Sequence, residues 1–201
     1  MDEVGSKFII FISTISVYTG GKISQNKNPF DEKSIIDPEG FYGNHKFQAE
    51  SICRDWSLKG INKKCAILRF SGIHGGGRKD GVIFNFIKKL SVSETIFIPS
   101  PYSRYSILNI NDAVKSILLI IKKEKNLRNE IFNIAGGEDM ELRQIAQKIK
   151  NIINSKSIIQ YGNKHPKIRS MDIRKAQLGM GFFPETFDSW IKKEICEISK
   201  E

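Results

Sequence analysis

Short apolar runs alternate with amphipathic stretches along this chain of 201 residues. Three runs have no polar alternation, at residues 7–13, 64–70 and 131–134. Such runs are typical of strands that are buried on both faces of a parallel sheet. Apolar spacing and Gly, Pro or Asn breaks predict short strands near 95–98, 105–110 and 157–160, and helices near 43–58, 81–90, 112–123, 139–153, 171–178 and 187–198.

The alternation of strands and helices predicts an α/β protein built on a parallel sheet. Asn111 or Asp112 is the expected cap of the helix at 112–123. The hydrophobic pattern of segments 78–110 and 155–185 is less regular than in the rest of the chain, so it marks no sharp boundary between two lobes. A hydrophobic content of 40% supports a packed core.

The formal net charge is +10. The lysines are spread in pairs over the polar faces and ends of predicted helices, which favours a solvated basic surface over a nucleic-acid site. A site for phosphate-bearing small molecules is the other reading of this charge. No apolar run approaches the roughly 20 residues that cross a membrane.

Three cysteines lie far apart and form no Cys-x-x-Cys pair. This spacing predicts reduced thiols, a cytoplasmic location and no metal site. The expected partners therefore include neither nucleic acid nor membrane.

A Tyr-x-x-x-Lys motif, Tyr42 to Lys46, follows the first apolar run and its terminal hydroxyls, Ser13 and Thr14. Residues four apart on a helix share a face, so a Lys46 cation would favour the phenolate form of Tyr42. A hydroxyl at the end of the neighbouring strand would hold a substrate oxygen. These groups suit proton transfer during redox chemistry on a carbinol. The motif alone is weak, and an ordinary helix with a half-buried Tyr and a solvated Lys is the alternative.

Five segments in the right order add weight to the motif. Residues 13–18 resemble Ser-Ser-x-x-Val-Tyr, 42–50 resemble Tyr-Gly-x-x-Lys-x-x-x-Glu, 68–75 resemble Leu-Arg-x-x-x-Val-Tyr-Gly, 107–113 resemble Phe-Val-His-Val-Asp-Asp-Val, and 132–137 resemble Tyr-Asn-Val-Gly-x-Gly. Together they resemble the extended short-chain dehydrogenase/reductases, the NAD-dependent epimerase/dehydratase group that acts largely on nucleotide sugars.

The resemblance implies roles for particular residues. The catalytic residues would be Thr14, Tyr42 and Lys46. The contacts with NAD or NADP would come from Ser13, Tyr42, Lys46, Ser71, Gly72 and Ile73. The substrate contacts would come from Ser16, His74, Arg104 and Arg169, and the two arginines suit a phosphate or carboxylate.

The resemblance also implies the architecture. Residues 1–77 would form the C-terminal part of a Rossmann-like catalytic domain, and 78–201 a small α/β substrate-binding lobe, with 105–153 returning to the core sheet. A partial Rossmann-like parallel sheet is therefore expected.

The family's Gly-x-x-Gly-x-x-Gly pyrophosphate loop has no counterpart before Phe8, where only seven residues stand. We therefore expect an N-terminally truncated protein whose binding of NAD or NADP by this chain alone is weak or absent. The expected activity is epimerisation, dehydration or reduction at a nucleotide-sugar carbinol. The alternatives are a non-catalytic remnant, or an enzyme half that a separate cofactor-binding chain completes. A homodimer, or a complex with such a half, is the expected assembly.

Overall fold

The computed structural model describes residues 5–20 and 29–198. Its elements are β1 (Phe8–Thr14), the 3₁₀ turn η1 (Ile15–Val17), α1 (Gly40–Leu58), β2 (Lys64–Phe70), β3 (Ile73–His74), α2 (Gly81–Ser91), β4 (Ile96–Ile98), β5 (Arg104–Tyr105), β6 (Leu108–Asn109), α3 (Ile110–Lys123), η2 (Glu124–Asn126), β7 (Glu130–Ile134), β8 (Met140–Glu141), α4 (Leu142–Ile153), β9 (Ile159–Tyr161), β10 (Ile168–Arg169), α5 (Arg174–Met180) and α6 (Phe187–Ile198).

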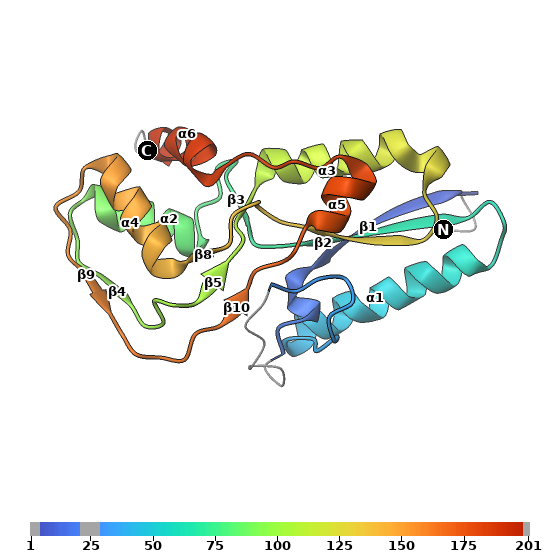
Figure 1. Ribbon diagram of the computed structural model, residues 1–201, viewed down its shortest axis with the longest axis horizontal. Helices are drawn as coiled ribbons and strands as arrows, with labels where there is room; N and C mark the ends of the chain where they lie inside the picture. The colour runs from blue at the N-terminus through green and yellow to red at the C-terminus, as the bar shows by residue number, and fades with distance from the viewer. Residues whose placement is uncertain (1–4, 21–28, 199–201) are drawn as a thin grey trace.

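The core is a parallel sheet in the order β1-β2-β7. Helix α1 covers one face of this sheet, and α3 and α5 cover the other (Figure 1). The prediction of an α/β protein with a parallel sheet is confirmed.

The two faces of β1 follow the period of two that strands impose on side chains. Ile9 and Phe11 pack with Cys53 of α1, whereas Ile10 and Ile12 pack into the larger cluster under α3 and α5. Both faces are apolar and both are covered by helices, which explains why the sequence of this strand shows no polar alternation.

A second core lies at the far end of the molecule, where α2, α4 and α6 pack together (Figure 1). Ile87, Ile149 and Ile191 contribute one fully buried side chain from each helix. Within residues 105–153, α3 and β7 lie at the core sheet, whereas α4 packs in this second core. The division of the chain at residue 77 stays a prediction.

Three local predictions were wrong. Asn109 caps α3, because its side-chain oxygen accepts a 2.9 Å hydrogen bond from the backbone N–H of Asn111. The strand expected at 105–110 is two strands, because β5 pairs with β10 and β8 whereas β6 pairs with β3. Helix α4 begins at Leu142 and not at 139, because Met140 and Glu141 pair with β5.

Within the described residues, the helices are all too short or too polar to cross a bilayer.

Candidate functional site

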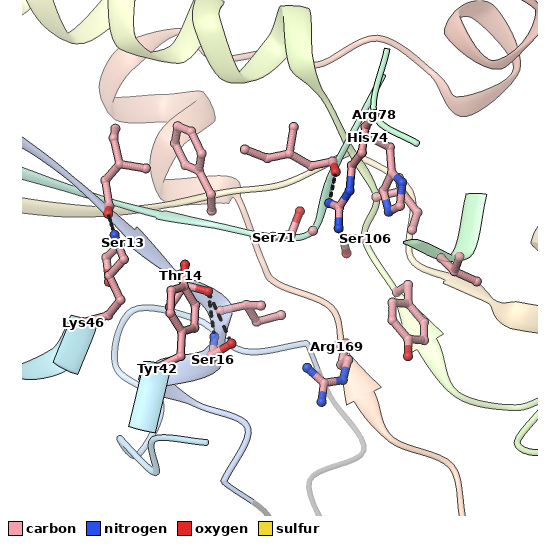
Figure 2. Close-up of a pocket in the computed structure, with 18 residues that line it drawn as sticks. Ser13, Thr14, Ser16, Tyr42, Lys46, Ser71, His74, Arg78, Ser106 and Arg169 are labelled. Carbon is pink, nitrogen blue, oxygen red and sulfur yellow. Dashed lines mark hydrogen bonds between the residues drawn. The ribbon is translucent and has the colours of Figure 1, made fainter. Parts of the chain in front are cut away.

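A cavity of about 380 Å³ opens where β1 ends and α1 begins. Its other walls come from the β2–β3 connection, β5 and β10 (Figure 2). The lining residues are Ile12, Ser13, Thr14, Ile15, Ser16, Tyr42, Lys46, Phe70, Ser71, Gly72, Ile73, His74, Arg78, Val82, Tyr105, Ser106, Ile107 and Arg169. The cavity therefore lies at the carboxyl ends of β1 and β2, where parallel α/β sheets commonly bind ligands.

Thr14 closes β1 and turns the chain into η1. Its Oγ1 accepts a 3.2 Å hydrogen bond from the backbone N–H of Ser16 and lies 3.4 Å from the Ser16 hydroxyl. This cap fixes the Thr14 side chain at the cavity wall, and it brings the Ser16 hydroxyl beside it (Figure 2).

Glycine at position 43 lets α1 start close to η1. A Cβ atom there would lie 2.6 Å from the carbonyl oxygen of Ser16, far inside van der Waals contact. The close approach places Tyr42, in the first turn of α1, beside Thr14 and Ser16 (Figure 2). The Tyr42 side chain is 58% exposed, so a ligand can reach it.

Lys46 lies one helical turn after Tyr42. Its Nζ donates a 2.8 Å hydrogen bond to the carbonyl oxygen of Ile12 in β1. The same ammonium lies 5.9 Å from the centroid of the Tyr42 ring and 5.1 Å from that of Phe11. The structure thus brings Thr14, Tyr42 and Lys46 together in one wall of the cavity.

The predicted cofactor contacts at 71–73 also line the cavity. Ser71 is buried, its backbone N–H donates to Ile134, and its hydroxyl has no hydrogen-bond partner among the described residues. An unsatisfied buried hydroxyl is costly, so this oxygen favours a bound polar group. The hydroxyl of Ser13, by contrast, has a partner, since it donates a 2.5 Å hydrogen bond to the Glu50 carboxylate.

His74 lies on β3 against the cavity and is only 6% exposed. Burial, assisted by the Arg78 charge, lowers the pKa of His74 from 6.5 to about 4. The imidazole is therefore neutral near pH 7. Arg78 is held by a 2.6 Å hydrogen bond to the carbonyl oxygen of Ile73 and by an ion pair with Asp80.

Arg169 enters the cavity from β10, across from Thr14 and Tyr42 (Figure 2). It pairs with Glu39, the residue that precedes α1. Burial opposes ionisation of Glu39, yet hydrogen bonds from Thr19 and Arg169 outweigh it and lower the pKa of this carboxyl. Arg104, the other predicted phosphate contact, forms an ion pair with Asp139 and is not among the lining residues.

Three polar lining residues were not found from the sequence: Arg78, Tyr105 and Ser106. They lie on short segments without a recognisable motif, and only the pairing of β3 with β6 and of β5 with β10 carries them to the cavity. Burial raises the pKa of Tyr105, so its phenol stays protonated.

In residues 5–20 and 29–198, no group of three His, Cys, Asp or Glu side chains is arranged to hold a metal ion.

Comparison with known proteins identifies the family. The model of the NAD dependent epimerase/dehydratase family matches residues 1–135. The chain belongs to this family. The matched range contains Thr14, Tyr42, Lys46 and the 71–74 segment, so the family resemblance inferred from the motifs is confirmed.

One similar protein is the dTDP-4-dehydro-6-deoxyglucose reductase of Escherichia coli, which is 31% identical to this chain over 206 residues. The match covers 98% of this chain and 63% of that protein. An undecaprenol-linked N-acetylglucosaminyl 4-epimerase of Escherichia coli O157:H7 is 26% identical over 158 residues, covering 78% of this chain and 45% of the relative. The chain thus spans about half to two-thirds of the length of these relatives.

Solved structures show the same fold. UDP-glucose 4-epimerase of Thermotoga maritima, solved with UDP-glucose, superposes with a TM-score of 0.82 at 22% identity over 98% of this chain and 65% of that one. UDP-glucuronic acid 4-epimerase of Bacillus cereus, solved with UDP-glucuronic acid and NAD, gives a TM-score of 0.82 at 22% identity, covering 96% and 62%. The described fold is therefore the Rossmann-like fold of the short-chain dehydrogenase/reductases.

Proposed function

We propose that the cavity is the sugar-binding side of an NAD(P)-dependent redox site that acts on a carbinol carbon of a nucleotide sugar. The observation that carries the proposal is the convergence of Thr14, Tyr42 and Lys46, from β1 and from one turn of α1, on a single accessible wall. Membership of the epimerase/dehydratase family supports the same chemistry.

Each of these side chains has a distinct role. The Tyr42 phenol exchanges a proton with the sugar hydroxyl or carbonyl oxygen. Lys46, fixed on the Ile12 carbonyl, holds a positive charge 5.9 Å from the centroid of the Tyr42 ring, where it would stabilise negative charge that develops during the proton transfer. The Thr14 hydroxyl, fixed by the Ser16 N–H, directs the sugar oxygen toward Tyr42.

The residues present fit a nicotinamide cofactor on the side of the cavity formed by 71–73. The Ser71 hydroxyl is buried and unpartnered, so it can meet the polar edge of such a ring. NAD or NADP, when bound, would supply or accept the hydride. Arg78, which lies beside Ile73, and Arg169, which lies across the cavity on β10, supply positive charge that suits the phosphates of a nucleotide sugar.

The test is the oxidation of NADH or NADPH in the presence of a 4-keto nucleotide sugar, followed at the absorbance of the reduced cofactor. The preparations are the 201-residue chain, alone and with a separately supplied cofactor-binding polypeptide. Tyr42→Phe should reduce turnover by roughly 10²–10⁴-fold. Tyr102→Phe is the matched control, since Tyr102 is also exposed but contacts Arg143 outside the cavity.

Near-normal turnover of Tyr42→Phe would overturn the assignment. An absence of turnover in both preparations, while a nucleotide sugar binds, would instead favour a non-catalytic binding protein.

A further inference from the structure

A buried ion pair lies between the core sheet and α1. Arg69 of β2 and Glu50 of α1 are 2% and 0% exposed, and their side chains meet in a fork of two bonds. Nη2 donates to Oε2 at 2.6 Å, and Nε donates to Oε1 at 2.9 Å. Such an arrangement fixes both the distance and the orientation of the two partners.

The Glu50 carboxylate also holds the strand that carries Thr14. The Ser13 hydroxyl donates a 2.5 Å hydrogen bond to Glu50 Oε1. Glu50 lies one helical turn after Lys46, which itself bonds to the Ile12 carbonyl. One face of α1 is thus hydrogen-bonded to β1 at two consecutive residues, Ile12 and Ser13, immediately before Thr14.

The third guanidinium nitrogen of Arg69 is also hydrogen-bonded. Arg69 Nη1 donates to the Tyr18 hydroxyl at 2.6 Å, and this hydroxyl donates to Asn133 Oδ1 at 2.9 Å. Burial raises the pKa of Tyr18 to about 12, so the phenol remains a donor. Burial opposes the charge on Arg69, but the bonds to Glu50 and Tyr18 outweigh it and raise the guanidinium pKa.

A buried ion pair is an inefficient way to stabilise a fold, because apolar residues of similar volume often do as well or better. What such a pair does well is to fix the distance and orientation of its two partners. In this chain it fixes α1 at the point where Tyr42 and Lys46 lie beside the end of β1.

We propose that Glu50, oriented by Arg69, is a positioning residue for the Thr14–Tyr42–Lys46 wall and acts through Ser13. The roles of those three groups rest on the proposed function. The position of α1 along β1 depends on the Ser13–Glu50 hydrogen bond. Loss of this bond should release Lys46 from the Ile12 carbonyl.

The test measures how fast Lys46 is acetylated in the folded 201-residue chain, by mass spectrometry. The exposed Lys59, at the end of the same helix, is the internal reference. Ser13→Ala removes only the hydrogen bond, and Glu50→Gln removes the charge while keeping the shape. The control variant is Cys53→Ala, which weakens the packing of α1 on the sheet and removes none of the hydrogen bonds of the Ser13–Glu50–Arg69 network.

Ser13→Ala should raise acetylation of Lys46 relative to Lys59 by about 3- to 10-fold, the ratio that corresponds to one lost hydrogen bond. Glu50→Gln should raise it less, because the amide oxygen can still accept from the Ser13 hydroxyl. Cys53→Ala should leave the ratio unchanged at a comparable loss of thermal stability. The double variant Arg69→Met with Glu50→Leu should recover stability relative to Glu50→Gln but keep Lys46 reactive, because Ser13 then has no acceptor.

An unchanged ratio in Ser13→Ala, or an equal rise in Cys53→Ala, would overturn the positioning role. Acetylation needs neither substrate nor cofactor, so this result stands apart from a failure of the proposed function. Where turnover is present, Ser13→Ala should lower kcat and leave KM for the sugar nearly unchanged, a split that simple destabilisation does not produce.

Discussion

Arg169 Nη2 donates hydrogen bonds of 2.7 and 2.8 Å to the two carboxylate oxygens of Glu39. The two residues are 130 positions apart in the sequence, and the bonds tie β10 to the start of α1. Both hydrogen bonds to Glu39 use the same guanidinium nitrogen, so Nε and Nη1 can meet a ligand in the cavity.

The first prediction concerns the nucleotide-sugar phosphates. Arg169→Met should weaken binding of UDP-glucose or dTDP-glucose by about 10-fold or more, because hydrogen bonds to charged groups contribute about 1.5–3 kcal/mol each. Arg104→Met should have a smaller effect, since Arg104 pairs with Asp139 away from the cavity. Isothermal titration calorimetry compares the two, and a larger loss in Arg104→Met would reverse the assignment of the phosphate contact.

Gly43 is expected to be intolerant of any side chain. Gly43→Ala should destabilise the chain by about 1–3 kcal/mol, because the added Cβ would force α1 away from the Ser16 carbonyl. Gly60→Ala is the matched control: its Cβ would meet only the flexible Lys63 side chain, at 3.5 Å, so we expect a change within about 0.5 kcal/mol. Urea unfolding measures both, and equal effects would refute the close-approach argument.

His74 predicts a pH dependence of stability. Its folded-state pKa of about 4 lies below the ordinary 6.5, so the unfolded chain binds the extra proton between these values. Stability from the neutral His74 is thus complete above pH 6.5 and is lost as pH falls toward 4. The full difference is about 3 kcal/mol at 1.36 kcal/mol per pKa unit.

The measurement is the free energy of unfolding from pH 4 to pH 7 in wild type, His74→Gln and His165→Gln. His165 lies in an exposed loop, so its variant should follow wild type. His74→Gln should show a shallower slope. The same slope in all three proteins would mean that His74 titrates normally in the folded state.

The outer edge of β1 predicts self-association. Within the described residues β1 pairs only with β2, and Phe8 to Ile12 are only partly buried. An apolar strand with unpaired backbone groups templates pairing with another chain. Sedimentation of the 201-residue chain should therefore show concentration-dependent association. A stable monomer with strong hydrogen-exchange protection at residues 8–12 would contradict this.

The sequence predicted the core elements well where a single cause determines them. The bounds of β2 at Lys64–Phe70 were predicted to the residue, because the apolar residues 65–68 and Phe70 mark a strand that is buried on both faces. The wall formed by Thr14, Tyr42 and Lys46 was also predicted, because helical spacing fixes Tyr42 relative to Lys46.

Features set by tertiary pairing were missed. The split of 105–110 into β5 and β6 depends on two different partner strands, which no local pattern encodes. Arg78 and Tyr105 reach the cavity through the same pairings. The engagement of Ser13 by Glu50 also depends on how α1 lies against β1, which neither sequence segment reveals alone.

We propose that the cavity at the ends of β1 and β2 binds a nucleotide sugar beside Tyr42. Hydrogen exchange with mass spectrometry, on the 201-residue chain with saturating UDP-glucose or dTDP-glucose, is the decisive measurement. At least one ligand should slow exchange in peptides covering 12–18, 40–47 and 168–172, and Arg169→Met should weaken this protection. No protection with either ligand, or protection confined to residues 138–151 around the start of α4, would contradict it.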